Sequence, residues 1–158
     1  MGIVMSLVGD VALSMEGDDW FVYGLSAFLV AHIAYIIGFI KLTRKMSQWE
    51  IVIPVLFYGI ILNYGLWPYM GDLRPYITGY AFVLLVMCLL SWQQTDKPIL
   101  AVGGTLFVLS DSLLAVNKFA FPIPLADVLV MLTYMLAQWM LVVGFSEKLV
   151  LKKSERVD

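Results

Sequence analysis

The sequence predicts an all-α protein, a polytopic transmembrane helical bundle of about six helices. Of its 158 residues, 61% are hydrophobic and only 14% are charged, whereas soluble domains usually carry about 25% charged residues. Short polar connections separate apolar stretches, most of them near the ~20 residues that a helix needs to cross a bilayer. The net charge of −2 provides no basic surface for nucleic acid. Composition therefore excludes both a soluble domain and a nucleic-acid binder.

The apolar stretches give the expected helices in order. They lie at residues 2–15, 20–40, 51–67, 75–93, 97–116 and 124–146. Pro75, Pro98 and Pro124 fall at or near helix starts, where the missing N–H costs nothing. The first helix, at ~21 Å, is short for a hydrocarbon core of ~30 Å. We expect residues 1–147 to form one transmembrane domain and residues 148–158 a cytoplasmic tail.

The basic residues predict the orientation of the bundle. The connections after the second, fourth and sixth helices hold all but two of the ten Lys and Arg residues. Arg74 and Lys118 lie on the opposite side, beside acidic residues such as Asp18 and Asp72. Because positive residues stay on the cytoplasmic side, both termini are expected there. The membrane would be the inner membrane in a bacterium or the endoplasmic reticulum in a eukaryote.

Three ionisable residues fall inside the expected helices: Asp10, His32 and Asp111. Such residues normally face a cavity or a partner and indicate function. Counting residues from the helix ends puts both aspartates about 9 Å from the outer side, on parallel helices, with His32 deeper. Two close carboxylates resist ionising together, so one can act as acid and the other as base. A structural polar contact and a proton or ion pathway are the alternatives.

Other polar residues surround these three. Spacings of three and four residues put His32 with Tyr35, and Tyr134 with Gln138, on shared helix faces. Ser110 flanks Asp111 directly. One histidine and one cysteine cannot supply a zinc site, which needs three or four ligands. We therefore expect no metal and no cofactor.

Four blocks of the sequence resemble the YhhN-type lysoplasmalogenase family of integral membrane proteins. They are SLVGDVALS, FLVAHIAYIIGF, FVLSDSLLAVNKFAFPIP and LTYMLAQWMLVVG, and the resemblance extends from Gly2 to about Ser146. It implies an eight-helix bundle and a hydrolase that cleaves the vinyl ether bond of lysoplasmalogens, giving a fatty aldehyde and a glycerophospho-base. This chain begins at the segment that matches the third of those helices, so the first two are expected to be missing.

The resemblance also implies roles for individual residues. Asp10 and Asp111 match the paired acidic residues of the family and would be catalytic. The implied substrate-binding residues are His32, Tyr35, Ser110, Asn117, Lys118, Tyr134 and Gln138. The partners would be a lysophospholipid substrate, water and membrane lipid. A small transporter, a non-catalytic lipid-binding homologue and a hydrolase of another ether or ester lipid are the alternatives.

Overall fold

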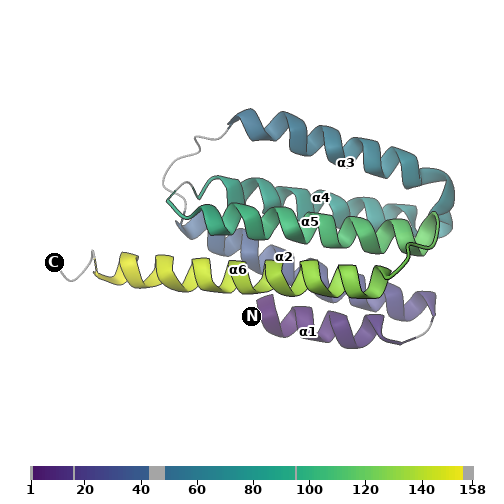
Figure 1. The fold of residues 1–158 in the computed structure, drawn as a ribbon, viewed down its shortest axis with the longest axis horizontal. Coiled ribbons are helices and arrows are strands. Elements are labelled where there is room, and N and C mark those ends of the chain that lie inside the picture. The colour runs from purple at the N-terminus through teal and green to yellow at the C-terminus, as the bar shows by residue number, and fades with distance from the viewer. Residues whose placement is uncertain (1, 16, 43–48, 95, 155–158) are drawn as a thin grey trace.

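The computed structural model describes residues 2–15, 17–42, 49–94 and 96–154, with side chains to Val150. Six α-helices form one bundle (Figure 1). They are α1 (Gly2–Leu13), α2 (Asp18–Leu42), α3 (Val52–Leu66), α4 (Arg74–Trp92), α5 (Pro98–Phe119) and α6 (Ala126–Ser154). Short 3₁₀ turns flank α3 and precede α4: η1 (Trp49–Ile51), η2 (Trp67–Tyr69) and η3 (Gly71–Leu73). The described residues contain no strand, so the predicted all-α class is confirmed.

The predicted helix boundaries agree with the structure to within about three residues, except at the end of α6. This helix continues to Ser154, well beyond the predicted end at residue 146, because Glu147, Lys148 and Leu149 are good helix formers without a Gly or Pro to stop them. The expected tail therefore begins as a continuation of α6. Its residues 155–158 lie outside the described part of the chain.

Helices alternate in direction, which defines two ends of the bundle (Figure 1). At the Asp18 end, α1, α3 and α5 finish and α2, α4 and α6 begin. We call the opposite end the Lys97 end. At the Asp18 end, Gly17 (φ +116°) and Gly71 (φ +52°) adopt backbone angles that other residues rarely accept. Asp18 and Asp19 in the first turn of α2 complement the positive end of its dipole.

The protein is a multi-pass membrane protein. Five of the described helical segments are long and apolar enough to cross a membrane, and α1 is a shorter apolar helix. Along α3, only Leu66 is buried, while residues such as Ile53, Phe57 and Ile60 are mostly exposed. Apolar side chains facing outward on this scale suit a lipid environment, where they replace the polar surface of a soluble protein.

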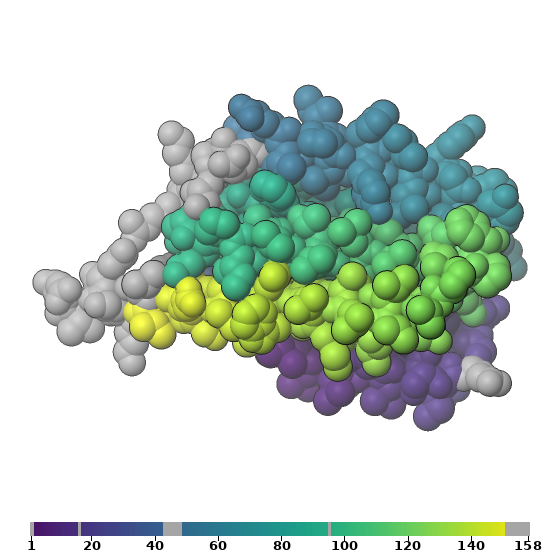
Figure 2. Space-filling view, viewed as in Figure 1, coloured from purple at the N-terminus to yellow at the C-terminus, as the bar shows by residue number. Residues whose placement is uncertain are grey.

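Helix α5 lies at the centre of the packing, between α4 and α6. In Figure 2 the side chains of α5 and α6 cover much of the face in view. Gly103 and Gly104 let both neighbours approach: a Cβ on Gly103 would lie 3.2 Å from the Ala137 carbonyl oxygen of α6. A Cβ on Gly104 would overlap Ser91 Oγ of α4. Small residues that allow such contact drive helix association in membranes.

The Lys97 end is held by ion pairs between the α4–α5 connection and α6. Lys97 Nζ lies 2.6 Å from Glu147 Oε2, and Lys148 Nζ lies 2.5 Å from Asp96 Oδ1. Partial burial opposes ionisation of Asp96, but the hydrogen bond from Lys148 and the nearby cations outweigh it and lower the pKa of this carboxyl. The Asp96 carboxyl therefore stays ionised at neutral pH. These pairs support the α6 extension that the sequence analysis missed.

Gly104→Ala should destabilise the bundle, because the added methyl group overlaps Ser91 and pushes α4 from α5. We expect a loss of about 1–3 kcal/mol, the usual cost of overpacking, measured by thermal or denaturant unfolding in detergent. Gly79→Ala is the matched control, since no neighbouring atom lies within 4 Å of the place its methyl group would occupy. Equal stability of the two variants would show that close α4–α5 contact is unimportant.

Candidate active site

A largely apolar cavity of about 290 Å³ runs from the Asp18 end into the bundle. All six helices contribute to its wall. Its oxygen-bearing side chains are Asp10, Ser14, Tyr58, Asn63, Tyr80, Ser110, Asp111, Ser112, Asn117, Asp127 and Tyr134. Both intramembrane aspartates predicted from the sequence therefore line a single cavity, although they are about 100 residues apart in the chain.

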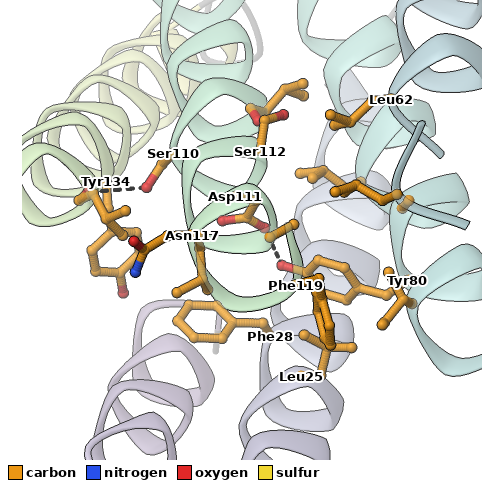
Figure 3. A pocket seen from close by; sticks show the side chains of 18 of the residues that line it. Leu25, Phe28, Leu62, Tyr80, Ser110, Asp111, Ser112, Asn117, Phe119 and Tyr134 are labelled. Carbon is orange, nitrogen blue, oxygen red and sulfur yellow. Dashed lines mark hydrogen bonds between the residues drawn. The ribbon is translucent and has the colours of Figure 1, made fainter. Parts of the chain in front are cut away.

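Asp111 extends from the middle of α5 toward Tyr80 of α4 (Figure 3). The Tyr80 hydroxyl donates a hydrogen bond to Asp111 Oδ2. Behind Tyr80, His32 Nε2 of α2 lies 3.0 Å from the Tyr80 hydroxyl and 3.9 Å from Asp111 Oδ2. His32 is fully buried, with the ring of Phe107 at its edge. It does not line the cavity and reaches Asp111 through Tyr80.

Asp10 belongs to a second chain of hydrogen bonds. The Tyr134 hydroxyl of α6 donates to Asp10 Oδ2 at 2.9 Å, and Gln138 Nε2 lies 3.4 Å from that hydroxyl. Gln138 also donates to Ser6 Oγ at 2.7 Å and accepts from the Tyr35 hydroxyl at 2.6 Å. The predicted Tyr134–Gln138 face thus connects α1, α2 and α6. His32 and Tyr35, expected together, join different chains.

The remaining predicted residues lie toward the Asp18 end or at a helix contact. Ser110 lines the cavity, but its hydroxyl donates to the Val130 carbonyl of α6. Asn117 also lines it, and its side-chain oxygen accepts from the Ile123 N–H at 2.9 Å. Lys118 lies outside the lining, 3.3 Å from Asp18 Oδ1 and over the ring of Phe21.

Sequence reasoning missed Tyr80, the residue that contacts Asp111 most directly. A tyrosine in an apolar stretch is ordinarily interpreted as a core residue, so its type did not indicate a functional role. Its depth in the membrane did indicate one. Tyr80 lies six residues from Arg74 at the start of α4, or about 9 Å, the same depth as the two aspartates. Depth counting applied to every polar side chain, rather than to ionisable ones alone, would have found it.

The arrangement contains the groups that proton transfer needs. Each carboxylate has a tyrosine hydroxyl as hydrogen-bond donor, and both face a space with mostly apolar walls. In the part of the chain that the structure describes, no three His, Cys, Asp or Glu side chains are grouped as metal ligands. Two carboxylates in such a space can supply an acid and a base side by side.

Comparison with known proteins identifies the family of this chain. A model of the YhhN family matches residues 1–145. The chain belongs to the YhhN family. That match includes Asp10, Asp111 and every other residue of the two hydrogen-bond chains.

Curated relatives of this YhhN protein carry the name lysoplasmalogenase. The chain is 28% identical to lysoplasmalogenase TMEM86A of Bos taurus over 155 residues, which covers 93% of this chain and 64% of the relative. It is 33% identical to lysoplasmalogenase TMEM86B of Sus scrofa, with 95% and 64% covered. A lysoplasmalogenase of Mycobacterium tuberculosis is 27% identical, with 90% and 58% covered.

The chain thus spans about three fifths of the length of the curated relatives it matches. No solved structure matches it significantly. The relatives identify the family, and the site geometry described above comes from this chain alone.

Gln138→Leu should loosen the junction of α1, α2 and α6. The substitution removes the partners of Tyr35, Ser6 and Tyr134 at once, and interhelical hydrogen bonds in membranes contribute about 0.6 kcal/mol each and up to ~1.7. We expect a loss of about 1–2 kcal/mol in unfolding experiments. Ser146→Ala is the control, because its hydroxyl bonds only within α6. A Gln138→Leu protein as stable as this control would contradict the expectation.

Proposed function

We propose that this protein is an integral membrane hydrolase that cleaves the vinyl ether bond of lysoplasmalogens, with Asp10 and Asp111 as its acid–base pair. The observation that carries the proposal is the meeting of these two carboxylates on one apolar cavity in a chain of the YhhN family. The lysoplasmalogenase name of its relatives supports the choice of substrate. Water is the second reactant.

The chemistry of a vinyl ether suits this set of groups. Protonation of the alkene carbon that is not bonded to oxygen produces an oxocarbenium ion, water adds to it, and the hemiacetal collapses to an aldehyde and an alcohol. One carboxylic acid can supply the proton, and one carboxylate can stabilise the cation and then accept a proton from water. Because the cavity walls are mainly apolar, the attraction between carboxylate and cation is weakly screened.

The apolar walls also suit the hydrocarbon chain of the substrate. Leucine and phenylalanine side chains from α2, α3 and α4 line the cavity beside the carboxylates. At the Asp18 end, the NH₂ group of Asn117 and the ammonium group of Lys118 would bind the phosphate, with Lys118 leaving Asp18. Ser110 and Tyr134 would contact substrate near the reacting bond, while His32, Tyr35 and Gln138 would support those contacts from behind.

The orientation remains part of the proposal. Among residues whose side chains the structure describes, Lys41, Lys97 and Lys148 lie toward the Lys97 end, and Arg74 and Lys118 lie toward the Asp18 end. Together with the basic residues that follow α2 and those near the C-terminus in the sequence, this distribution supports cytoplasmic termini. The lysophospholipid headgroup would then enter from the outer or lumenal side.

Asp10→Asn and Asp111→Asn should each lower vinyl ether cleavage by at least about 100-fold, the contribution expected of a general acid or base. Purified protein would be incubated with lysoplasmalogen, and the released aldehyde would be measured. Asp72→Asn is the control, since Asp72 lies near the Asp18 end but not on the cavity. Folding of all three variants would be checked by gel filtration and thermal unfolding.

The same assay separates the alternatives. Near-normal activity in either aspartate variant would show that Asp10 and Asp111 are not the acid–base pair. Substrate flux in proteoliposomes without aldehyde would indicate a transporter, and bound lysolipid without product would indicate a non-catalytic binding protein. Release of fatty acid from an acyl lysolipid instead of aldehyde would indicate an ester hydrolase.

Lys118→Met should raise KM for the phosphate-bearing substrate by about tenfold, equivalent to a charge-assisted contact of ~1.4 kcal/mol, with little change in kcat. Asp18→Asn should do the opposite, because it releases Lys118 from its ion pair. Steady-state kinetics on both variants test the contact. If KM is unchanged in both, Lys118 does not bind the headgroup.

A further inference from the structure

We propose that Tyr80 and His32 are positioning residues that keep Asp111 ionised, so that Asp10 is the proton donor of the pair. This inference rests on the proposed function, and it assigns the two roles that the pair alone leaves interchangeable. It depends on the direction of the hydrogen bonds that link His32, Tyr80 and Asp111.

The direction follows from the unpaired nitrogen of His32. Within the described part of the chain, His32 Nδ1 is buried and has no hydrogen-bond partner. A buried N–H without an acceptor is rare in proteins, and a charged imidazolium would leave one here. The neutral ring with its proton on Nε2 avoids this cost. In that tautomer the Nε2–H donates to the Tyr80 oxygen, 3.0 Å away.

The Tyr80 hydroxyl must then donate its own proton to Asp111. Its oxygen is occupied as the acceptor from His32, and Asp111 Oδ2 is its second contact. The opposite arrangement requires a protonated Asp111 and also leaves an Nδ1–H buried without an acceptor. The chain therefore runs from His32 through Tyr80 to an ionised Asp111. Each donor polarises the next, which strengthens the final bond to the carboxylate.

Asp10 has weaker support for a negative charge. Tyr134 donates to it at 2.9 Å, but the Gln138 amide lies 3.4 Å from the Tyr134 oxygen and makes its shorter bond, 2.7 Å, to Ser6. The two carboxylates line the same largely apolar cavity, where two negative charges repel each other. Since only one of them readily ionises, the charge belongs on Asp111 and the proton on Asp10.

With these roles the reaction balances. Asp10 gives its proton to the alkene carbon that is not bonded to oxygen, and Asp111 faces the resulting oxocarbenium ion. Water adds to the carbon bonded to oxygen, and Asp111 takes one of its protons. The hemiacetal then loses its hydroxyl proton to Asp10 while Asp111 protonates the departing glycerol oxygen. Aldehyde and alcohol leave, and both carboxyl groups return to their starting states.

The titratable groups that share the cavity with Asp111 allow a matched test. They are Tyr58 of α3, Tyr80 of α4 with His32 of α2 behind it, Asp10 of α1, and Asp127 and Tyr134 of α6. Tyr80 and Tyr134 each donate to one carboxylate only. Tyr80→Phe and Tyr134→Phe therefore remove one hydroxyl from one partner and leave both aspartates in place.

The pH–rate profile of kcat/KM identifies which partner each tyrosine controls. Activity should fall in acid as the ionised carboxylate is protonated and fall in alkali as the proton donor ionises. Tyr80→Phe should move the acidic limb to higher pH by about one unit, since a lost donor makes the ionised carboxylate easier to protonate. Tyr134→Phe should move the alkaline limb to higher pH instead. If Tyr80→Phe moves the alkaline limb and Tyr134→Phe moves the acidic limb, or if neither limb moves in either variant, the assignment is wrong.

Variants of His32 test its part in the chain. His32→Leu removes the donor to Tyr80 and should move the acidic limb in the same direction as Tyr80→Phe. His32→Gln retains an N–H at the position of Nε2 and should restore the wild-type limb. A general loss of packing would lower activity in both variants without separating their acidic limbs. If the acidic limb lies at the same pH in both variants, His32 does not act on Asp111 through Tyr80.

Failure of this inference is separable from failure of the proposed function. If the protein releases no aldehyde, or if Asp10→Asn and Asp111→Asn remain active, the proposed function fails. If aldehyde is released and both aspartates are required, but the limbs move otherwise than stated, only the assignment of acid and base fails.

Discussion

The structure depends on one constraint: polar groups inside a membrane protein must find their partners within the protein. Asp10 and Asp111 lie in helices whose outer faces are apolar, and lipid offers them no hydrogen bonds. Each therefore meets a tyrosine from another helix, and each tyrosine is held by a further polar side chain. These two chains fix how five of the six helices are placed around the cavity.

The packing follows from the same constraint. Hydrogen bonds between helices require the backbones to lie close, and glycines make this possible where α5 meets α4 and α6. At Gly9, next to Asp10, a Cβ would lie 2.6 Å from the ring of Phe28. Phe28 in turn packs against Tyr134 and Phe107. Apolar contacts thus hold the Tyr134 ring, and the position of that ring determines where its hydroxyl group lies. The packing of the helices and the placement of their hydrogen bonds therefore depend on each other.

The sequence predicted the fold well because the hydrophobic pattern of membrane helices is strong. It predicted that Asp10 and Asp111 would lie together, which their shared cavity confirms, because charged groups in apolar helices are rare and their depth can be counted from helix ends. The end of α6 was predicted wrongly, since its extension depends on ion pairs with the α4–α5 connection. Such pairs are formed by tertiary contact and leave no local pattern.

The partners of the polar residues could not be predicted for a related reason. His32 and Tyr35 share a helix face, yet that face borders both α4 and α6, so the two residues contact Tyr80 and Gln138 respectively. Helical spacing gives the direction of a side chain but not the neighbour it meets. Tyr80 was missed because its ring suits an apolar core, and only its hydroxyl has a polar role.

The two hydrogen-bond chains give the two carboxylates different surroundings, which the proposed acid–base reaction requires. Two equivalent aspartates would share one proton, and neither would be held as donor or acceptor when substrate arrives. Here Asp111 is at the end of a directed chain that begins on a fully buried histidine, whereas Asp10 depends on a tyrosine that has a weaker support. Because these donors come from helices fixed by packing, the difference exists before any substrate binds, and in the proposed reaction little reorganisation would be needed when positive charge develops beside Asp111.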